Sequence, residues 1–235
     1  MKTIGIIGGM GAAATADLFS KIIAFTDASA DQEHVPLLID NNTAIADRTG
    51  AILGTGADPF PELCRSAKRL EAAGAEALIM ACNTAHYYYD RLAACINIPF
   101  LHMPRETAKR AAELGLQKLA LLATSGTIQS GVYSAAFQKG APGIELLLPS
   151  KEEQKEVMHL IYDIVKADRW TTSTECFSQL LRSMSERGAE AFLLGCTELP
   201  VAFQRLQFNF VTLDPTAIIA ETAVSFAGAK LKEYR

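Results

Sequence analysis

Short apolar runs alternate with stretches in which apolar residues recur at helical spacing along the whole chain. The runs predict strands at residues 3–7, 35–40, 76–81, 99–102, 118–123, 144–148, 190–195 and 209–213. The stretches between them predict helices at 12–27, 60–73, 84–95, 105–114, 130–139, 151–167, 174–187 and 216–232. Strands that alternate with helices indicate an α/β fold with parallel sheets flanked by helices.

Two segments 114 residues apart are nearly the same, which indicates an internal duplication. Residues 74–84 and 188–198 each begin Gly-Ala-Glu-Ala, continue as an apolar run and end in a cysteine, Cys82 or Cys196, followed by polar residues. Residues 2–11 similarly match 118–127, and 100–103 match 210–213. The period is too long for a solenoid. We therefore predict two pseudo-symmetric α/β lobes, each with a parallel sheet, and an active site in the cleft between them.

The charge and the cysteines narrow the class of protein. A net charge of −4 over 235 residues argues against a nucleic-acid partner, which would need a basic face. The sequence has no apolar run of about 18 residues, and the first predicted strand begins at Thr3, so we expect no membrane span and no signal peptide. Five cysteines without zinc-ligand or CxxC spacing are typical of a cytoplasmic protein with reduced thiols and no metal site.

Glycine-rich or polar loops follow four predicted strands, at residues 8–11, 82–84, 124–127 and 196–198. Parallel α/β sheets bind ligands at this edge. The first loop fits the G-x-G-x-x-A dinucleotide pattern from Gly9, but the nearest suitable acidic residue, Asp40, lies 31 residues further on instead of about 20. A nicotinamide enzyme would also not explain two matched cysteines. We therefore favour a carboxylate at the N–H groups around Gly9 and Met10.

Cys82 and Cys196 each end a strand just before a helix, where the helix dipole and free N–H groups stabilise a thiolate. A single free cysteine is usually a buried packing residue, and we predict that role for Cys64, Cys95 and Cys176. The matched pair favours catalysis instead. Proton transfer at both faces of one carbon is the leading reaction that needs a sulfur on each side of a small substrate.

Residues 41–56 show no clear apolar period and contain Arg48 among three glycines. A loop of this length in a compact domain is usually functional or mobile. Arg48 is therefore a candidate ligand for an anion. Lys166, by its own pattern, is a solvated helix residue.

Together these segments resemble the PLP-independent aspartate/glutamate racemase family, in particular its aspartate racemase branch. The matching residues are 8–11, 47–49, 82–86, 124–133 and 195–200, spread over nearly the whole chain. The paired Cys-Asn-Thr and Gly-Cys-Thr-Glu signatures are specific. Ala12 and Ala81 stand where many relatives have proline, which affects loop rigidity and no reacting group.

The resemblance implies cofactor-independent racemisation of an acidic amino acid, with aspartate favoured. Cys82 and Cys196 would be the two bases, one a thiolate and one a thiol, with roles that exchange with substrate handedness. The resemblance also implies binding of the α-carboxylate and ammonium by Asn83, Thr84, Thr124 and Thr197, with Thr127 as a further substrate-binding residue. It implies binding of the side-chain carboxylate by Arg48 and Lys166. His86 and Glu198 would hold the thiols in orientation, or would be helix-surface or capping residues.

On the family pattern we place one lobe at residues 1–103, with 216–235 packing back on it, and the other at 104–215, and we expect a homodimer. The family also contains hydantoin racemases, maleate isomerases and arylmalonate decarboxylases. Two cysteines argue against a decarboxylase, which needs one proton donor. A broad-specificity racemase that also takes glutamate, a maleate isomerase, and an amino-acid-binding protein without turnover stay open as alternatives.

Overall fold

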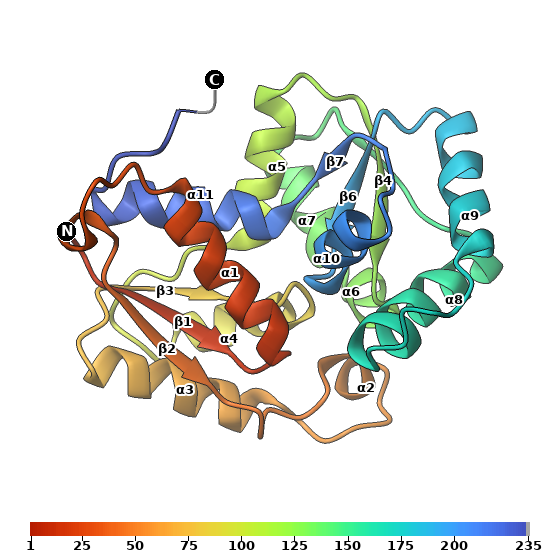
Figure 1. Cartoon of the computed structure of the whole chain (residues 1–235). Coiled ribbons are helices and arrows are strands. Elements are labelled where there is room, and N and C mark those ends of the chain that lie inside the picture. The colour runs from red at the N-terminus through yellow and green to blue at the C-terminus, as the bar shows by residue number, and fades with distance from the viewer. Residues whose placement is uncertain (234–235) are drawn as a thin grey trace.

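Two parallel sheets form the centre of the computed structural model, which describes residues 1–233 (Figure 1). The strand order is β2-β1-β3 in the first sheet and β5-β4-β6-β7 in the second. The strands are β1 (Ile4–Gly8), β2 (Leu37–Asn41), β3 (Ala77–Met80), β4 (Lys118–Ala123), β5 (Glu145–Leu147), β6 (Ala191–Gly195) and β7 (Thr212–Leu213). The predicted α/β fold with two parallel sheets flanked by helices is confirmed.

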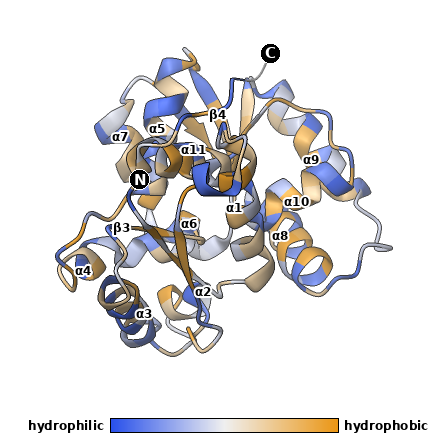
Figure 2. Ribbon diagram, turned by 60° about the vertical axis from the view of Figure 1, so that its left-hand side comes forward, coloured by the Kyte–Doolittle hydropathy of each residue, from blue (hydrophilic) through white to orange (hydrophobic). Residues whose placement is uncertain are grey.

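The α-helices are α1 (Ala12–Phe25), α2 (Arg48–Ile52), α3 (Phe60–Ala72), α4 (Tyr89–Ala93), α5 (Met103–Glu113), α6 (Ser125–Ser130), α7 (Val132–Gly140), α8 (Lys151–His159), α9 (Glu175–Glu186), α10 (Glu198–Arg205) and α11 (Pro215–Ala227). There are also two 3-10 segments, η1 (Asp31–Glu33) and η2 (Thr84–Tyr88), and a π-helical segment, η3 (Leu160–Lys166). Figure 2 shows hydrophilic and hydrophobic residues alternating along outer helices such as α3 and α9. No helix within residues 1–233 is long and apolar enough to cross a membrane.

Successive residues of β1 point to opposite faces of the first sheet, as the pleat requires. Ile4 and Ile6 pack with Leu18 of α1 and with α11, whereas Ile7 packs with Leu63 of α3. The second sheet is arranged in the same way, with α5 and α7 on one face and α8, η3, α9 and α10 on the other. Both sheets are therefore covered on both faces, which is typical of parallel sheets.

The strand register brings the polar loops together in pairs. Ile7 of β1 pairs with Met80 of β3, and Ala123 of β4 pairs with Gly195 of β6, so the residues that follow these strands begin side by side. The two sheets also share the order second, first and third strand of each half. The duplicated segments thus occupy equivalent places, and both Cys82 and Cys196 follow the third strand of their sheet.

Several predicted elements differ from the structure. The predicted helix 130–139 is α7, which Gly131, in a left-handed conformation with φ of 65°, separates from the preceding helix α6. The predicted helix 84–95 begins as the 3-10 segment η2, and the predicted helix 151–167 continues from α8 into the π-helical η3. The helix predicted at 216–232 ends at Ala227, where Gly228 is left-handed. Helices α6 and α10 and segment η1 were not predicted.

The predictions for residues 41–56 and 99–102 were also incomplete. The first segment contains α2, which begins because the Asp47 side chain accepts the N–H of Gly50. The second is not a strand: Phe100 makes a single bridge to Leu78 of β3. The chain enters α5 at Met103, which leaves no room for a longer ladder.

The C-terminal helix α11 lies against both lobes. Ile219 and Ala223 belong to the apolar cluster that contains β1 and β3, whereas Ile218 belongs to the cluster that contains β4. Figure 1 shows α11 beside α1 and reaching toward α5. Residues 234 and 235 of the predicted segment 216–235 lie outside the described residues.

The unmatched cysteines divide into two groups. Cys64 and Cys95 are half-buried against the apolar cluster of the first lobe, as predicted for packing residues. Cys176 is exposed, so its predicted packing role is wrong. Helix α9 turns Phe177 and Leu180 into the core and leaves Cys176 on the opposite, solvent side.

Candidate active site

A narrow cavity lies where the carboxyl ends of the two sheets face each other. Its lining contains ten of the predicted site residues: Met10, Arg48, Cys82, Asn83, Thr84, Thr124, Lys166, Cys196, Thr197 and Glu198. The side chains leave a free volume of only about 10 Å³, which is about what a single water molecule needs. The cavity is therefore closed in this structure, with less free space than an amino acid occupies.

Three predicted residues lie just outside this lining. Thr127 is one hydrogen bond away, because its Oγ1 is 2.7 Å from the Oγ1 of Thr84. Gly9 packs against backbone: a Cβ at this position would lie 2.4 Å from the carbonyl of Asn42. The ring of His86 lies on the far side of Cys82, where its Nδ1 is 2.8 Å from the Cys82 carbonyl oxygen and its Nε2 accepts the Met103 N–H.

Arg48 is the cation beside Cys82. Its Nη2 donates to the Met10 carbonyl at 2.9 Å and its Nη1 donates to the Ala46 carbonyl at 3.1 Å, while its Nε is buried with no hydrogen-bond partner. Burial by itself would lower the pKa of Arg48, but the neighbouring Cys82 sulfur and Asp47 carboxylate outweigh it and hold the pKa above its usual value. Arg48 is thus a fixed positive charge facing one thiol, with one donor still free.

Cys196 lies beside a carboxylate, whereas Cys82 lies beside a cation. Its Sγ donates to Oε2 of Glu198 at 2.9 Å, and Oε1 of Glu198 is 3.1 Å from Nζ of Lys166. Complete burial, together with the carboxylate of Glu198, raises the pKa of Cys196 well above its usual value. Cys196 is therefore a protonated thiol at neutral pH, and Glu198 fixes its direction.

Lys166 lies at the cavity because of the π-helical segment η3. Burial by itself would lower the pKa of Lys166, but Glu198 and the two cysteines outweigh it and raise the pKa. Its Nζ also lies 5.2 Å from the centre of the Tyr162 ring, four residues earlier on η3. Lys166 is thus held in an ion pair and is not a freely solvated helix residue.

Four threonine hydroxyls join the two lobes next to the thiols. Thr84 of η2 is 3.1 Å from Thr124 and 2.7 Å from Thr127, and Thr124 is in turn 3.2 Å from Thr49 of α2, between the Oγ1 atoms. Threonine hydroxyls can both donate and accept, so this cluster can rearrange to meet a carboxylate or an ammonium group.

Three lining residues were missed: Asp47, Thr49 and Tyr162. Asp47 and Thr49 flank Arg48 in the matched motif, so their position was a usable signal. Tyr162 had no comparable signal, because only the π-helical geometry of η3 turns it toward α2, where its hydroxyl donates to Oδ1 of Asp47 at 3.3 Å.

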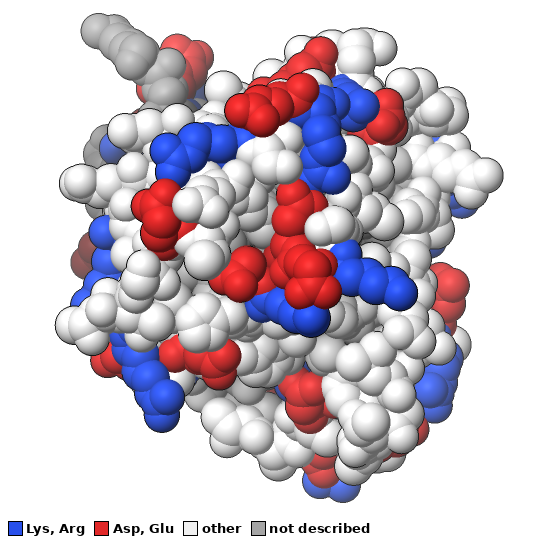
Figure 3. Space-filling view, turned by 90° about the vertical axis from the view of Figure 1, so that its right-hand side faces the viewer, with Lys and Arg blue, Asp and Glu red and all other residues white. Residues whose placement is uncertain are grey.

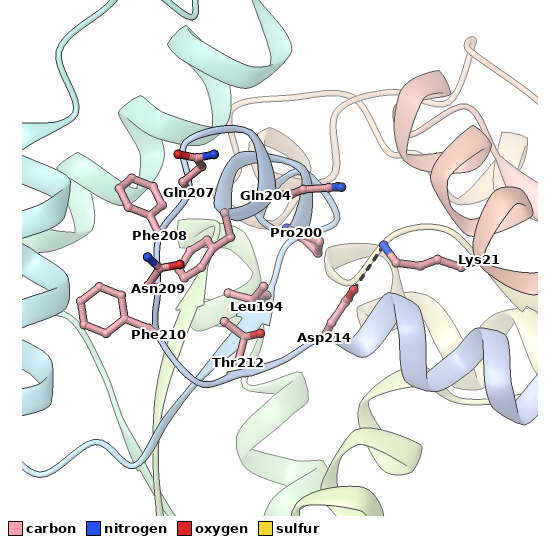
Figure 4. Close-up of a pocket in the computed structure, with 11 residues that line it drawn as sticks. Lys21, Leu194, Pro200, Gln204, Gln207, Phe208, Asn209, Phe210, Thr212 and Asp214 are labelled. Carbon is pink, nitrogen blue, oxygen red and sulfur yellow. Dashed lines mark ion pairs between the residues drawn. The ribbon is translucent and has the colours of Figure 1, made fainter. Parts of the chain in front are cut away.

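A larger hollow, of about 620 Å³, lies away from the thiols beside α10 and β7 (Figure 4). Its wall includes Phe208, Phe210 and the ion pair between Lys21 and Asp214, whose Nζ and Oδ2 are 3.2 Å apart. It holds none of the predicted site residues, so the cavity between the two thiols, although smaller, is the candidate site. Acidic and basic side chains are interspersed on the face shown in Figure 3. Within residues 1–233, no group of three or more His, Cys, Asp or Glu residues is arranged to hold a metal ion.

Comparisons with known proteins identify the family. The model of the Asp/Glu/Hydantoin racemase family matches residues 7–223. The chain is 26% identical to the broad specificity amino-acid racemase RacX of Bacillus subtilis, over 94% of this chain and 96% of that protein. The solved structure of Picrophilus torridus aspartate racemase has a TM-score of 0.88 and 31% identity, covering 99% of this chain and 96% of that one. An aspartate racemase homologue from Pyrococcus horikoshii has a TM-score of 0.76 and 25% identity, covering 97% and 100%.

The family expected from the two cysteine motifs is therefore confirmed. Its matched region, residues 7–223, includes each residue that lines the cavity between the two thiols. The relatives above are an amino-acid racemase, an aspartate racemase and an aspartate racemase homologue. The chain is thus an isomerase that acts on amino acids, and it belongs to the Asp/Glu/Hydantoin racemase family.

Proposed function

We propose that the protein racemises aspartate without a cofactor, with Cys82 and Cys196 as acid–base groups on opposite sides of the α-carbon. The observation that carries this proposal is the unlike environment of the two sulfurs in one cavity. Arg48 lies beside Cys82, whereas Cys196 donates a hydrogen bond to Glu198. A neighbouring cation favours a thiolate and a neighbouring carboxylate favours a thiol. The proposal therefore assigns the role of acid to Cys196, whose pKa is raised by burial and Glu198, and the role of base to Cys82.

The reaction follows from that pairing. The Cys82 thiolate removes the α-hydrogen of one enantiomer as a proton, and the Cys196 thiol returns a proton to the opposite face. The product is the other enantiomer, and the enzyme now has a Cys82 thiol and a Cys196 thiolate. A proton must move back to Cys196, by way of solvent or by turnover of the opposite enantiomer, before the first reaction can repeat.

The free donors of the cavity support an acidic substrate. The Nδ2 of Asn83 and the Nε of Arg48 are both buried without a partner. Carboxylate oxygens would satisfy both donors, since leaving a buried donor unpaired costs about 1–3 kcal/mol. We assign the α-carboxylate to Asn83 and the threonine hydroxyls, where fixed donors also stabilise the carbanion, and the side-chain carboxylate to Arg48 and Lys166.

The test of racemisation is exchange of the α-hydrogen in deuterated water. Purified protein, dialysed against a chelator and a carbonyl reagent, should incorporate deuterium at the α-carbon of L- and D-aspartate and convert each into the other, as followed by proton NMR and chiral chromatography. Loss of both activities on dialysis, with recovery on addition of pyridoxal phosphate, would refute the cofactor-free mechanism.

The test of specificity is the Arg48→Ala variant. Loss of a charge-assisted contact worth about 1.5–3 kcal/mol should lower kcat/KM for aspartate by one to two orders of magnitude. An amino acid with an uncharged side chain should be affected much less. Equal losses for both substrates would instead assign Arg48 to the α-carboxylate, to the Cys82 sulfur or to the folding of α2.

A broad-specificity racemase is the second candidate, because the similarity to the racemase RacX extends over 94% of this chain. The same exchange assay with a panel of acidic, neutral and basic amino acids separates the two. Comparable kcat/KM values across the panel would favour the broad enzyme.

A further inference from the structure

Tyr133 is a buried residue behind the cavity whose hydroxyl touches a residue of the cavity lining. It lies in α7 on the second lobe, is only 1% exposed, and donates a hydrogen bond to Oδ1 of Asn83, which follows β3 in the first lobe. Tyr133 itself does not line the cavity. Burial raises the pKa of Tyr133 well above its usual value, so its phenol stays protonated and can act as the donor.

The side-chain amide of Asn83 has two possible orientations related by a half-turn. In the orientation that Tyr133 favours, Oδ1 faces the phenol and Nδ2 is turned away from it. That Nδ2 is buried and has no hydrogen-bond partner, although Asn83 lines the cavity. The flipped amide would present an oxygen to the cavity, where it would repel a carboxylate.

We propose that Tyr133 is a positioning residue that fixes the amide of Asn83 so that its Nδ2 donates to the carboxylate of the substrate. The proposal depends on the proposed function only for the identity of that carboxylate. Because the hydrogen bond joins the two lobes, Asn83 takes its binding orientation when the cleft is closed. Substrate binding is thereby coupled to closure.

The principal test is the Tyr133→Phe variant, which removes the hydroxyl and keeps the ring that packs beside Phe137. Asn83 then samples both amide orientations. A contact to the α-carboxylate is already made in the ground state, so its loss raises KM, and because the same donor also stabilises the carbanion, kcat falls as well. We expect KM for aspartate to rise by about tenfold, the effect of losing one hydrogen bond of about 1.4 kcal/mol.

A double-mutant cycle separates positioning from general packing. In an Asn83→Ala background there is no amide to orient, so Tyr133→Phe should change KM by less than about twofold. The matched control is Tyr89→Phe, since the Tyr89 hydroxyl donates to the Phe100 carbonyl at 2.7 Å away from the cavity lining. It should lower the melting temperature without changing KM. An equal effect of Tyr133→Phe in both backgrounds, or a loss in kcat alone, would overturn the proposal.

A binding measurement, first on the parent protein and then on the variant, does not depend on turnover. Succinate, which has the two carboxylates of aspartate without the ammonium group, serves as the probe. In ¹⁵N-labelled protein, succinate should shift the side-chain amide resonances of Asn83, and in a folded Tyr133→Phe variant it should bind about tenfold more weakly. Unchanged Asn83 resonances at saturating succinate would refute the positioning role. If succinate shifts the Asn83 resonances but the protein does not racemise aspartate, the proposed function is refuted and the positioning role of Tyr133 is not.

Discussion

The main charged neighbours of the two sulfurs in this cavity have opposite sign, Arg48 beside Cys82 and Glu198 beside Cys196. The Nη1 and Nη2 atoms of Arg48 donate to backbone carbonyls, so its guanidinium cannot easily turn away. Glu198 accepts the hydrogen bond of Cys196 and is neutralised in part by Lys166. A pseudo-symmetric fold thus contains a chemically asymmetric pair, and this asymmetry leads to predictions for single side chains.

The first prediction concerns the two thiols. Replacing either Cys82 or Cys196 with serine should lower racemisation by about 10³-fold or more, because a hydroxyl is a far weaker acid than a thiol. One-sided α-hydrogen exchange should survive for opposite enantiomers in the two variants. Cys82→Ser leaves only Cys196 to act as the base, so its exchange should need alkaline pH, because burial and Glu198 raise the pKa of Cys196. Exchange at neutral pH in Cys82→Ser, or a Cys82→Ser variant that racemises at near the parent rate, would contradict the assignment.

The second prediction concerns Glu198. Cys196 must be protonated when it acts as the acid, so the rate in that direction falls as pH rises through the pKa of Cys196. Glu198→Gln removes the carboxylate that helps to raise this pKa and frees Lys166, whose charge lowers it. Both changes act in the same direction, so the alkaline limb of the kcat/KM profile should move to lower pH. The exposed Glu186→Gln is the control, and an alkaline limb that stays in place would show that Glu198 does not act on Cys196.

At the scale of elements, His86 ties the end of β3 to the start of α5. Its Nδ1–H donates to the carbonyl of Cys82 and its Nε2 accepts the Met103 N–H, so both ring nitrogens are used only in the neutral form. Complete burial lowers the pKa of His86 to about 4 from 6.5. His86 is therefore protonated near pH 6.5 in the unfolded chain but only near pH 4 in the folded protein.

The third prediction follows from this difference. Because the pKa of His86 is lower in the folded protein than in the unfolded chain, His86 stabilises the folded protein at pH values above the unfolded pKa. This stabilisation is lost as the pH falls from the unfolded pKa toward the folded pKa. Unfolding in urea should therefore show a loss of about 2 kcal/mol from this residue between pH 7 and pH 5. His86→Asn should be less stable at pH 7 and should show a smaller decrease over that range. The same replacement at the surface residue His159 is the control, and equal slopes for the two variants would contradict the assignment.

The elements also show what could be predicted from the sequence. Apolar runs located seven strands because burial on both faces requires continuous apolar residues, and the repeated motif located both cysteines. The positions of Tyr162 and Lys166 depend on η3, whose π-helical turns have no distinct apolar period. The orientation of Asn83 depends on Tyr133, a contact between lobes that no local pattern contains. Helix α2 is five residues long, too short for a periodic signal, and depends on its Asp47 cap.

At the scale of the whole molecule, the proposed function requires the cavity to open for a substrate, because its free volume of about 10 Å³ is smaller than an amino acid. The closed form brings α2 against α6, where a Cβ on Gly126 would lie 2.7 Å from the Cα of Thr49. The hydrogen bond from Tyr162 to Asp47 spans the same gap between the lobes. Contact between α2 and α6 therefore requires glycine at position 126. The packing of the core within each lobe does not require a glycine there.

The last prediction uses that contact. Gly126→Ala should hold α2 and α6 apart by the width of a methyl group and so misplace Arg48 and Thr49 relative to the second lobe. Since a displacement of about 1 Å can cost a hundredfold in rate, we expect kcat/KM to fall by about 10- to 100-fold while the melting temperature changes little. Gly143→Ala, whose added Cβ would meet no atom within 4 Å, is the control. A large fall in melting temperature would mean that Gly126 serves folding, and an unchanged kcat/KM would mean that the reaction does not require this contact. A loss of activity with preserved stability would instead show that closure of the two lobes completes the site.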